Sequence, residues 1–84
     1  MKPWSVYLLK CCDHSLYCGV TTDIDNRLLK HARGVASKYT RSRLPVQLVA
    51  ACKGLSKQAA FKLEYRIKQL PAEQKITTLT NVEL

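Results

Sequence analysis

The stretch that decides the fold is WSVYLLKCCDHSLYCGV, which spans residues 4–20. Its first part, residues 4–11, and its last part, residues 16–20, contain the aromatic and β-branched residues that favour strands. The Asp-His-Ser segment at residues 13–15 is typical of a tight turn. Two strands joined this closely pair in antiparallel fashion, so the stretch predicts a β-hairpin near the start of the chain.

A helix is predicted directly after the hairpin. Asp23, with two threonines before it, offers a cap. Ile24 and Leu28 then recur at helical spacing, and Gly34 suits the end of the helix. Residues 35–45 carry three cations and no acid, and they are predicted to form a basic loop.

The second half of the chain predicts one more strand and two more helices. Residues 46–52 are apolar and strand-like, and Gly54 and Ser56 mark a turn and a helix cap. Residues 57–70 carry an apolar stripe at helical spacing. Pro71 can open a third helix, because proline is tolerated in a first turn. The order β-β-α-β-α-α predicts an α+β fold with helices packed on a small sheet.

The length and composition indicate one globular domain. The chain has 84 residues, of which 46% are hydrophobic, and we expect a single domain over residues 1–84. No apolar run approaches the about 20 residues that a membrane span needs. The first residues lack the apolar core of a signal peptide. We therefore expect a cytoplasmic protein without a membrane partner.

The charge balance predicts a polyanionic partner. The net charge is +8, from 14 basic and 6 acidic residues. An excess of this density on a small domain favours DNA or RNA first and an acidic membrane surface second. The alternative is a basic domain without such a partner.

The cysteine pattern argues against a structural zinc site. No pair has the C-x-x-C spacing that such sites use, and two adjacent cysteines on a strand point to opposite faces. In a cytosolic protein they are predicted to be reduced thiols, packed like small hydrophobic residues. The four cysteines are Cys11, Cys12, Cys18 and Cys52.

Glu64 is the carboxylate that could bind a metal ion. It lies one position from the apolar stripe of the second long helix, where a glutamate needs a partner. Such a group could hold one Mg²⁺, with waters and a substrate phosphate completing the coordination. The alternative is an ion pair with Lys68 at i+4. The other acids near the hairpin occupy turn or cap positions, which argues against a two-metal cluster.

Arg27 and His31 are candidates for phosphate binding and proton transfer. They lie four residues apart and so share one face of the first helix. An arginine can fork onto phosphate oxygens, and a histidine can relay a proton near neutral pH. The alternative is a surface pair, or a histidine at the edge of the core.

The hairpin supplies two tyrosines and a glycine. Tyr7 and Tyr17 stand on the paired strands, where they could also be core or cross-strand aromatics. Gly19 lies inside the second strand and would let another backbone or a substrate come close.

The basic loop is a candidate nucleic-acid contact. It mixes cations with one aromatic ring, a composition that suits phosphate contacts together with base or sugar stacking. The alternative is an ordinary solvated loop. The candidate residues are Lys38, Tyr39, Arg41 and Arg43.

Taken in order, these residues resemble the GIY-YIG nuclease family, and within it the small stand-alone, single-domain branch (UPF0213-like). The tripeptides Ser5-Val6-Tyr7 and Tyr17-Cys18-Gly19 stand where the family has its two signature tripeptides. Arg27 and His31 follow Tyr17 by ten and fourteen residues, as in the family's helix motif. Glu64 lies on the later helix, where the family keeps its metal-binding glutamate. The stretch Lys38-Tyr39-Thr40 with Arg41, Arg43 and Pro45 resembles that of the small branch.

The resemblance implies a fold and an activity. The fold is a three-stranded antiparallel sheet flanked by helices, and the activity is a DNA endonuclease that uses one divalent cation, Mg²⁺ or Mn²⁺. Glu64 would bind the metal, and Arg27 would stabilise phosphate charge. Tyr17 or Tyr7 would orient or deprotonate the attacking water. His31 would assist proton transfer, orient a tyrosine or itself be the base.

Other functions stay open beside the nuclease. The chain could be a nucleic-acid-binding module with the same fold and little catalysis, or an interaction domain that delivers DNA to a partner. Many family members carry an asparagine after the metal glutamate, whereas here Asn81 lies far along and Lys75 is the candidate substitute. The chain has no room for the separate targeting domain of larger members. A second copy of the chain (a homodimer) or a protein partner would then supply specificity.

Overall fold

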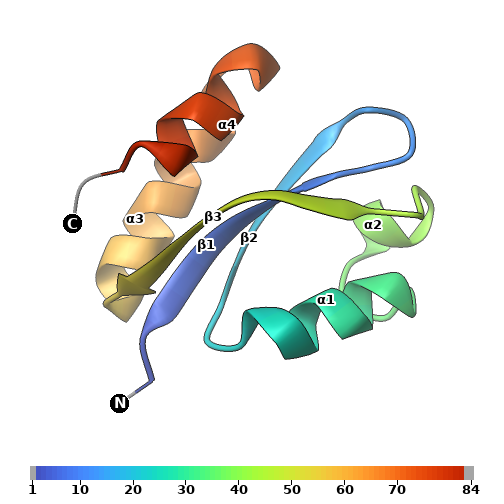
Figure 1. Ribbon diagram of the computed structural model, residues 1–84, viewed down its shortest axis with the longest axis horizontal. Coiled ribbons are helices and arrows are strands. Elements are labelled where there is room, and N and C mark those ends of the chain that lie inside the picture. Colours follow the sequence, from blue (N-terminus) through green and yellow to red (C-terminus); the bar gives the residue numbers. More distant parts are fainter. Residues whose placement is uncertain (1, 83–84) are drawn as a thin grey trace.

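The computed structural model describes residues 2–82. Along the chain these residues form β1 (Trp4–Lys10), β2 (Leu16–Thr21), α1 (Ile24–Ala32), α2 (Lys38–Arg41), β3 (Gln47–Leu55), α3 (Lys57–Lys68) and α4 (Ala72–Thr80). Figure 1 shows α3 and α4 together on one side of the strands, and α1 and α2 on the other. No helix within residues 2–82 is long and apolar enough to cross a membrane.

The three strands form one antiparallel sheet in the order β2-β1-β3. This arrangement confirms the predicted hairpin and the predicted α+β class. Tyr7 in the central strand pairs with Gly19 on β2 and with Ala51 on β3. Because side chains alternate along a strand, Tyr7 shares its face of the sheet with Leu9, and with Tyr17 and Gly19 across the β1–β2 ladder.

The opposite face of the sheet carries the main hydrophobic core. There α3 and α4 pack on the strands, which explains the apolar stripe predicted for the second long helix. All four cysteines are free, and three of them are buried as expected of small hydrophobic residues. The buried members of this core are Val6, Leu8, Cys18, Cys52, Leu55, Ala60, Leu63, Ile67 and Leu79.

Two local features differ from the sequence expectation. The segment predicted as a basic loop contains the short helix α2, whose first turn is capped by the Ser37 side chain. Gly54, predicted as a turn, lies inside β3, because that strand continues to Leu55 and pairs there with Trp4. A register shift follows Trp4 in this ladder, and Gly54 has a φ of +80°, so the glycine fits an irregularity in the strand. The predicted cap at Ser56 and the helix opening at Pro71 are both present.

Candidate active site

A chain of hydrogen bonds joins three elements on the α1–α2 side of the sheet. The hydroxyl of Tyr7, on β1, lies 2.8 Å from Nε2 of His31, on α1. Nδ1 of the same imidazole lies 2.8 Å from Oγ1 of Thr40, on α2. His31 and Thr40 are fully buried, and Tyr7 is 2% exposed. The chain therefore lies beneath the surface, where its hydrogen bonds are shielded from water.

One arrangement of protons gives every donor in this chain of hydrogen bonds a partner. The Thr40 hydroxyl lies 3.3 Å from the carbonyl oxygen of Ser37, which can only accept. In this arrangement Thr40 donates to Ser37 and accepts from Nδ1–H of His31. Nε2 then carries no proton and accepts the hydrogen of the Tyr7 hydroxyl. Thr40, which residue chemistry alone did not single out, thus positions His31 as a proton acceptor.

Burial and charge keep both partners neutral. Burial, and then the nearby Arg27 charge, lower the pKa of His31 below its ordinary value. Burial raises the pKa of Tyr7, with a further contribution from Tyr17, and the Arg27 charge partly opposes this. Tyr7 is therefore a protonated hydrogen-bond donor that supports the site from below. Arg27 acts on both groups, as expected for a residue on the same helix face as His31.

Tyr17 connects this buried pair to the surface. Its ring is half-buried and lies edge-on to His31, with 5.3 Å between the ring centroids. Its other neighbour is Tyr39, a stacked ring at 6.0 Å and 28°, which is 38% exposed. Of the two hairpin tyrosines, Tyr17 is the more exposed.

Gly19 makes room for the Tyr7 ring. A Cβ at this position would lie 2.6 Å from the Tyr7 hydroxyl oxygen and 2.7 Å from its Cζ. The Tyr7 side chain thus makes a close approach at Gly19. The glycine is therefore a structural requirement of the Tyr7–His31 hydrogen bond.

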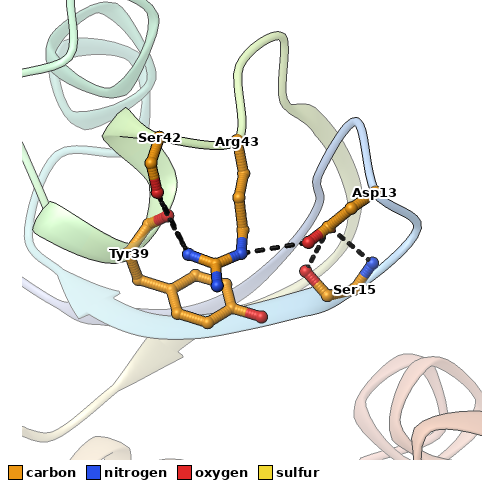
Figure 2. Close-up of polar contacts among 5 residues, drawn as sticks. All are labelled: Asp13, Ser15, Tyr39, Ser42 and Arg43. Carbon is orange, nitrogen blue, oxygen red and sulfur yellow. Dashed lines mark hydrogen bonds and ion pairs between the residues drawn. The ribbon is translucent and has the colours of Figure 1, made fainter.

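Arg43 ties α2 to the β1–β2 turn (Figure 2). Its Nε donates to Asp13 at 3.0 Å and its Nη1 donates to the Tyr39 carbonyl at 2.9 Å, while the guanidinium lies 3.9 Å from the Tyr39 ring centroid. Hydrogen bonds from Ser15 and from Arg43 lower the pKa of Asp13. Arg43 thus already has partners within the chain. Lys38 and Arg41, in the same segment, are exposed.

Glu64 lies on α3, against the other face of the sheet. Its side chain is 19% exposed, and one carboxylate oxygen lies 3.3 Å from Nζ of Lys68, so the alternative ion pair is present. The Glu64 charge contributes to raising the pKa of Tyr7 and, after burial, that of Cys18 to about 11. The negative charge of Glu64 therefore disfavours ionisation of Tyr7 on β1 and of Cys18 on β2.

The described side chains could bind a metal ion only if water and substrate phosphate supplied most of its ligands. Within residues 2–82 no group of three or more His, Cys, Asp or Glu could hold a metal. A single carboxylate at Glu64, with waters and phosphate oxygens, suits Mg²⁺ or Mn²⁺, which are commonly bound in this way. Lys75, the candidate substitute for an asparagine, donates to the carbonyls of Ile67 and Lys68 instead. Asn81 ends α4.

The lowered pKa of His31 predicts a pH-dependent stability. His31 binds a proton more readily in the unfolded chain than in the folded one. The free energy of unfolding should therefore reach its full value, as far as His31 is concerned, above about pH 6.5. It should fall as the pH drops toward the pKa of the buried imidazole. Chemical denaturation between pH 7.5 and 5 measures this. His31→Gln should flatten the slope, whereas His14→Asn, at the exposed histidine, should leave it in place. An unchanged slope in His31→Gln would contradict the assignment.

Comparison with known proteins identifies the class to which this fold and site belong. A family model described as the GIY-YIG catalytic domain matches residues 3–77. The chain therefore belongs to the GIY-YIG family, which is associated with endonuclease activity.

Its relatives within that family are small UPF0213 proteins. A UPF0213 protein of Nitratidesulfovibrio vulgaris is 44% identical over 79 residues, which cover 94% of this chain and 72% of the relative. The solution structure of the UPF0213 protein BH0048 from Bacillus halodurans has a TM-score of 0.58 at 43% identity and covers 94% of this chain and 87% of that one. The solution structure of EF2693 from E. faecalis has a TM-score of 0.65 at 36% identity, covering 94% and 84%.

Proposed function

We propose that this protein is a metal-dependent endonuclease that hydrolyses phosphodiester bonds in DNA. The observation that carries the proposal is the Tyr7–His31–Thr40 chain beneath the half-buried Tyr17. Three elements converge to hold a neutral imidazole against the Tyr7 hydroxyl, an arrangement that a binding surface does not require. Membership of the GIY-YIG family supports the same chemistry.

The residues divide into those that meet the substrate and those that support them. The Tyr17 hydroxyl orients the attacking water, because Tyr17 is the tyrosine nearer to solvent. The Tyr7 hydroxyl passes its proton to Nε2 of His31, 2.8 Å away, and takes up the proton that the attacking water releases. As the new P–O bond forms, the P–O bond to the leaving strand breaks, and the leaving oxygen takes a proton from solvent. Arg27 offers a permanent positive charge to the phosphate, whose negative charge grows as the water attacks. Thr40 keeps His31 in the required tautomer.

Glu64 would hold the divalent cation, Mg²⁺ or Mn²⁺. A bound cation polarises a phosphate oxygen and stabilises developing negative charge. The carboxylate would have to leave Lys68, and an ion pair that is partly exposed is weak enough to allow this. The ammonium group of Lys68 would then be free for a phosphate.

The nucleic-acid surface would continue onto α2. Lys38 and Arg41 are exposed there, next to the partly exposed Tyr39 ring. Together with the net charge of +8, these residues suit a DNA backbone, with RNA as the alternative. A second copy of the chain or a protein partner would add sequence preference. The free cysteines suit a reducing compartment such as the cytoplasm.

Removal of divalent metal is expected to stop cleavage completely. Supercoiled plasmid and a branched duplex are incubated with the protein in Mg²⁺ or Mn²⁺ and separately in EDTA, and products are resolved on a gel. Nicking should appear only with the metal and should return when Mg²⁺ is added in excess over EDTA. Cleavage that persists in EDTA would contradict the metal-dependent mechanism.

A nucleic-acid-binding module with weak or no catalysis is the second candidate. It is favoured by the Glu64–Lys68 ion pair, and by the absence from the described part of the chain of any group of three or more His, Cys, Asp or Glu that could hold a metal. The same assay separates the two candidates. Salt-sensitive binding without cutting, in either metal, would support the binding module.

A further inference from the structure

Helix α3 presents two large aromatic rings to solvent. Phe61 is 43% exposed and Tyr65 is 70% exposed. They are four residues apart, so their side chains are neighbours on the helix surface. Burying such rings against the core would be favourable, so their exposure calls for a reason.

Trp4, the first residue of the central strand β1, extends this surface. Its ring centroid lies 5.4 Å from that of Phe61, at an angle of 53°. The ammonium group of Lys57 lies 5.9 Å from the Trp4 ring. We call Trp4, Phe61 and Tyr65 the α3 aromatic strip. The strip adjoins the proposed metal ligand, because Glu64 follows Phe61 by three residues and is therefore its neighbour on the helix surface.

The charges around the strip favour a polyanion over an apolar protein partner. Within α3, Glu64 is the sole acid, and it is paired with Lys68. Protein–protein interfaces are depleted in lysine, whereas surfaces for single-stranded nucleic acid combine cations with exposed rings. The cations of the helix are Lys57, Lys62, Arg66 and Lys68, all exposed.

We propose that the α3 aromatic strip binds unpaired DNA nucleotides beside the phosphate that is cut. This inference rests on the proposed function for the position of that phosphate, near Glu64. A duplex hides the faces of its bases, whereas unpaired bases can stack on exposed rings. Phe61 and Tyr65 are about 6 Å apart along the helix axis, enough for successive bases to stack. The preferred substrate is therefore DNA with a single-stranded segment, such as a flap or a branch.

The proposal for the α3 aromatic strip is tested by measuring DNA binding under conditions that prevent cleavage. Fluorescence anisotropy in EDTA follows the whole chain as it binds a labelled oligonucleotide of about 12 nucleotides, either single-stranded or as a duplex. Tyr65→Ala should weaken single-strand binding about tenfold, because stacking of one base contributes on the order of 1–3 kcal/mol. It should leave duplex binding nearly unchanged. Tyr65→Phe keeps the ring and should bind as the parent does. Val35→Ala, at an exposed apolar position elsewhere, should also have no effect.

A second readout comes from Trp4, the one tryptophan of the chain. Single-stranded DNA should quench its fluorescence, and duplex should do so much less. Equal losses for both forms of DNA in Tyr65→Ala, or no loss, would overturn the proposal. So would tighter binding of an RNA strand of the same sequence, or a strip that instead mediates dimerisation in sedimentation runs. Because these experiments exclude metal, a chain that binds single strands but never cuts would refute the nuclease and not the strip.

Discussion

Glu64→Gln is expected to lower the rate of metal-dependent DNA cleavage by at least about a hundredfold. A cation on this carboxylate would supply several kcal/mol of transition-state stabilisation, and each 1.36 kcal/mol corresponds to about a tenfold change in rate. Glutamine keeps the size of the side chain but loses the charge that holds the cation. The initial rate of plasmid nicking at saturating Mg²⁺ measures the effect.

The matched control is Glu73→Gln. Glu73 is an exposed acid in the first turn of α4, so its replacement makes the same change in net charge away from the site. It should leave the rate within about twofold. DNA binding by Glu64→Gln should be retained or become slightly tighter, because a negative charge is removed and Lys68 loses its partner. A Glu64→Gln variant that cuts as fast as the parent would remove Glu64 from the metal role.

The sequence predicted the features that depend on periodicity and turn chemistry. The hairpin followed from two apolar runs around Asp13, and the caps at Asp23 and Ser56 accept hydrogen bonds from Asn26 and Ala59 as such caps do. The sequence also placed Tyr7, Tyr17 and Gly19 on the two paired strands, and the structure adds the register, in which Tyr7 pairs with Gly19. These features depend on residues that are close together in the chain, so they can be predicted from the sequence.

The features that the sequence did not predict depend on contacts between distant segments. Helix α2 is a single turn, too short to show a periodic pattern, so Thr40 could not be linked to His31 from the sequence. Arg43 looked free for phosphate, yet Asp13, 30 residues away, accepts from it. Gly54 resembled a turn residue because the pairing of Leu55 with Trp4 is not visible in the sequence. The sequence left open whether Glu64 pairs with Lys68, and the structure shows this ion pair.

Gly19→Ala is expected to destabilise the fold by about 1–3 kcal/mol, the usual cost of overpacking a close-packed interior. The added Cβ would overlap the hydroxyl and Cζ of Tyr7, which is buried and held by His31. Relief requires the Tyr7 ring to move, which lengthens its hydrogen bond to His31. Cleavage should therefore fall together with stability. Urea denaturation followed by Trp4 fluorescence measures the free energy of unfolding.

A double-mutant cycle with Tyr7→Leu tests whether the ring itself causes the loss. In the Tyr7→Leu background the Cβ at position 19 meets no phenol, so Gly19→Ala should cost less than it does in the parent chain. A coupling free energy of about 0.5–3 kcal/mol is expected, in the range found for residues in direct contact. Strictly additive losses would mean that the strand, or the Tyr17 ring whose Cε2 lies 3.1 Å from the added Cβ, requires the glycine, and not the Tyr7 ring. Gly19 would then have no part in holding Tyr7 against His31.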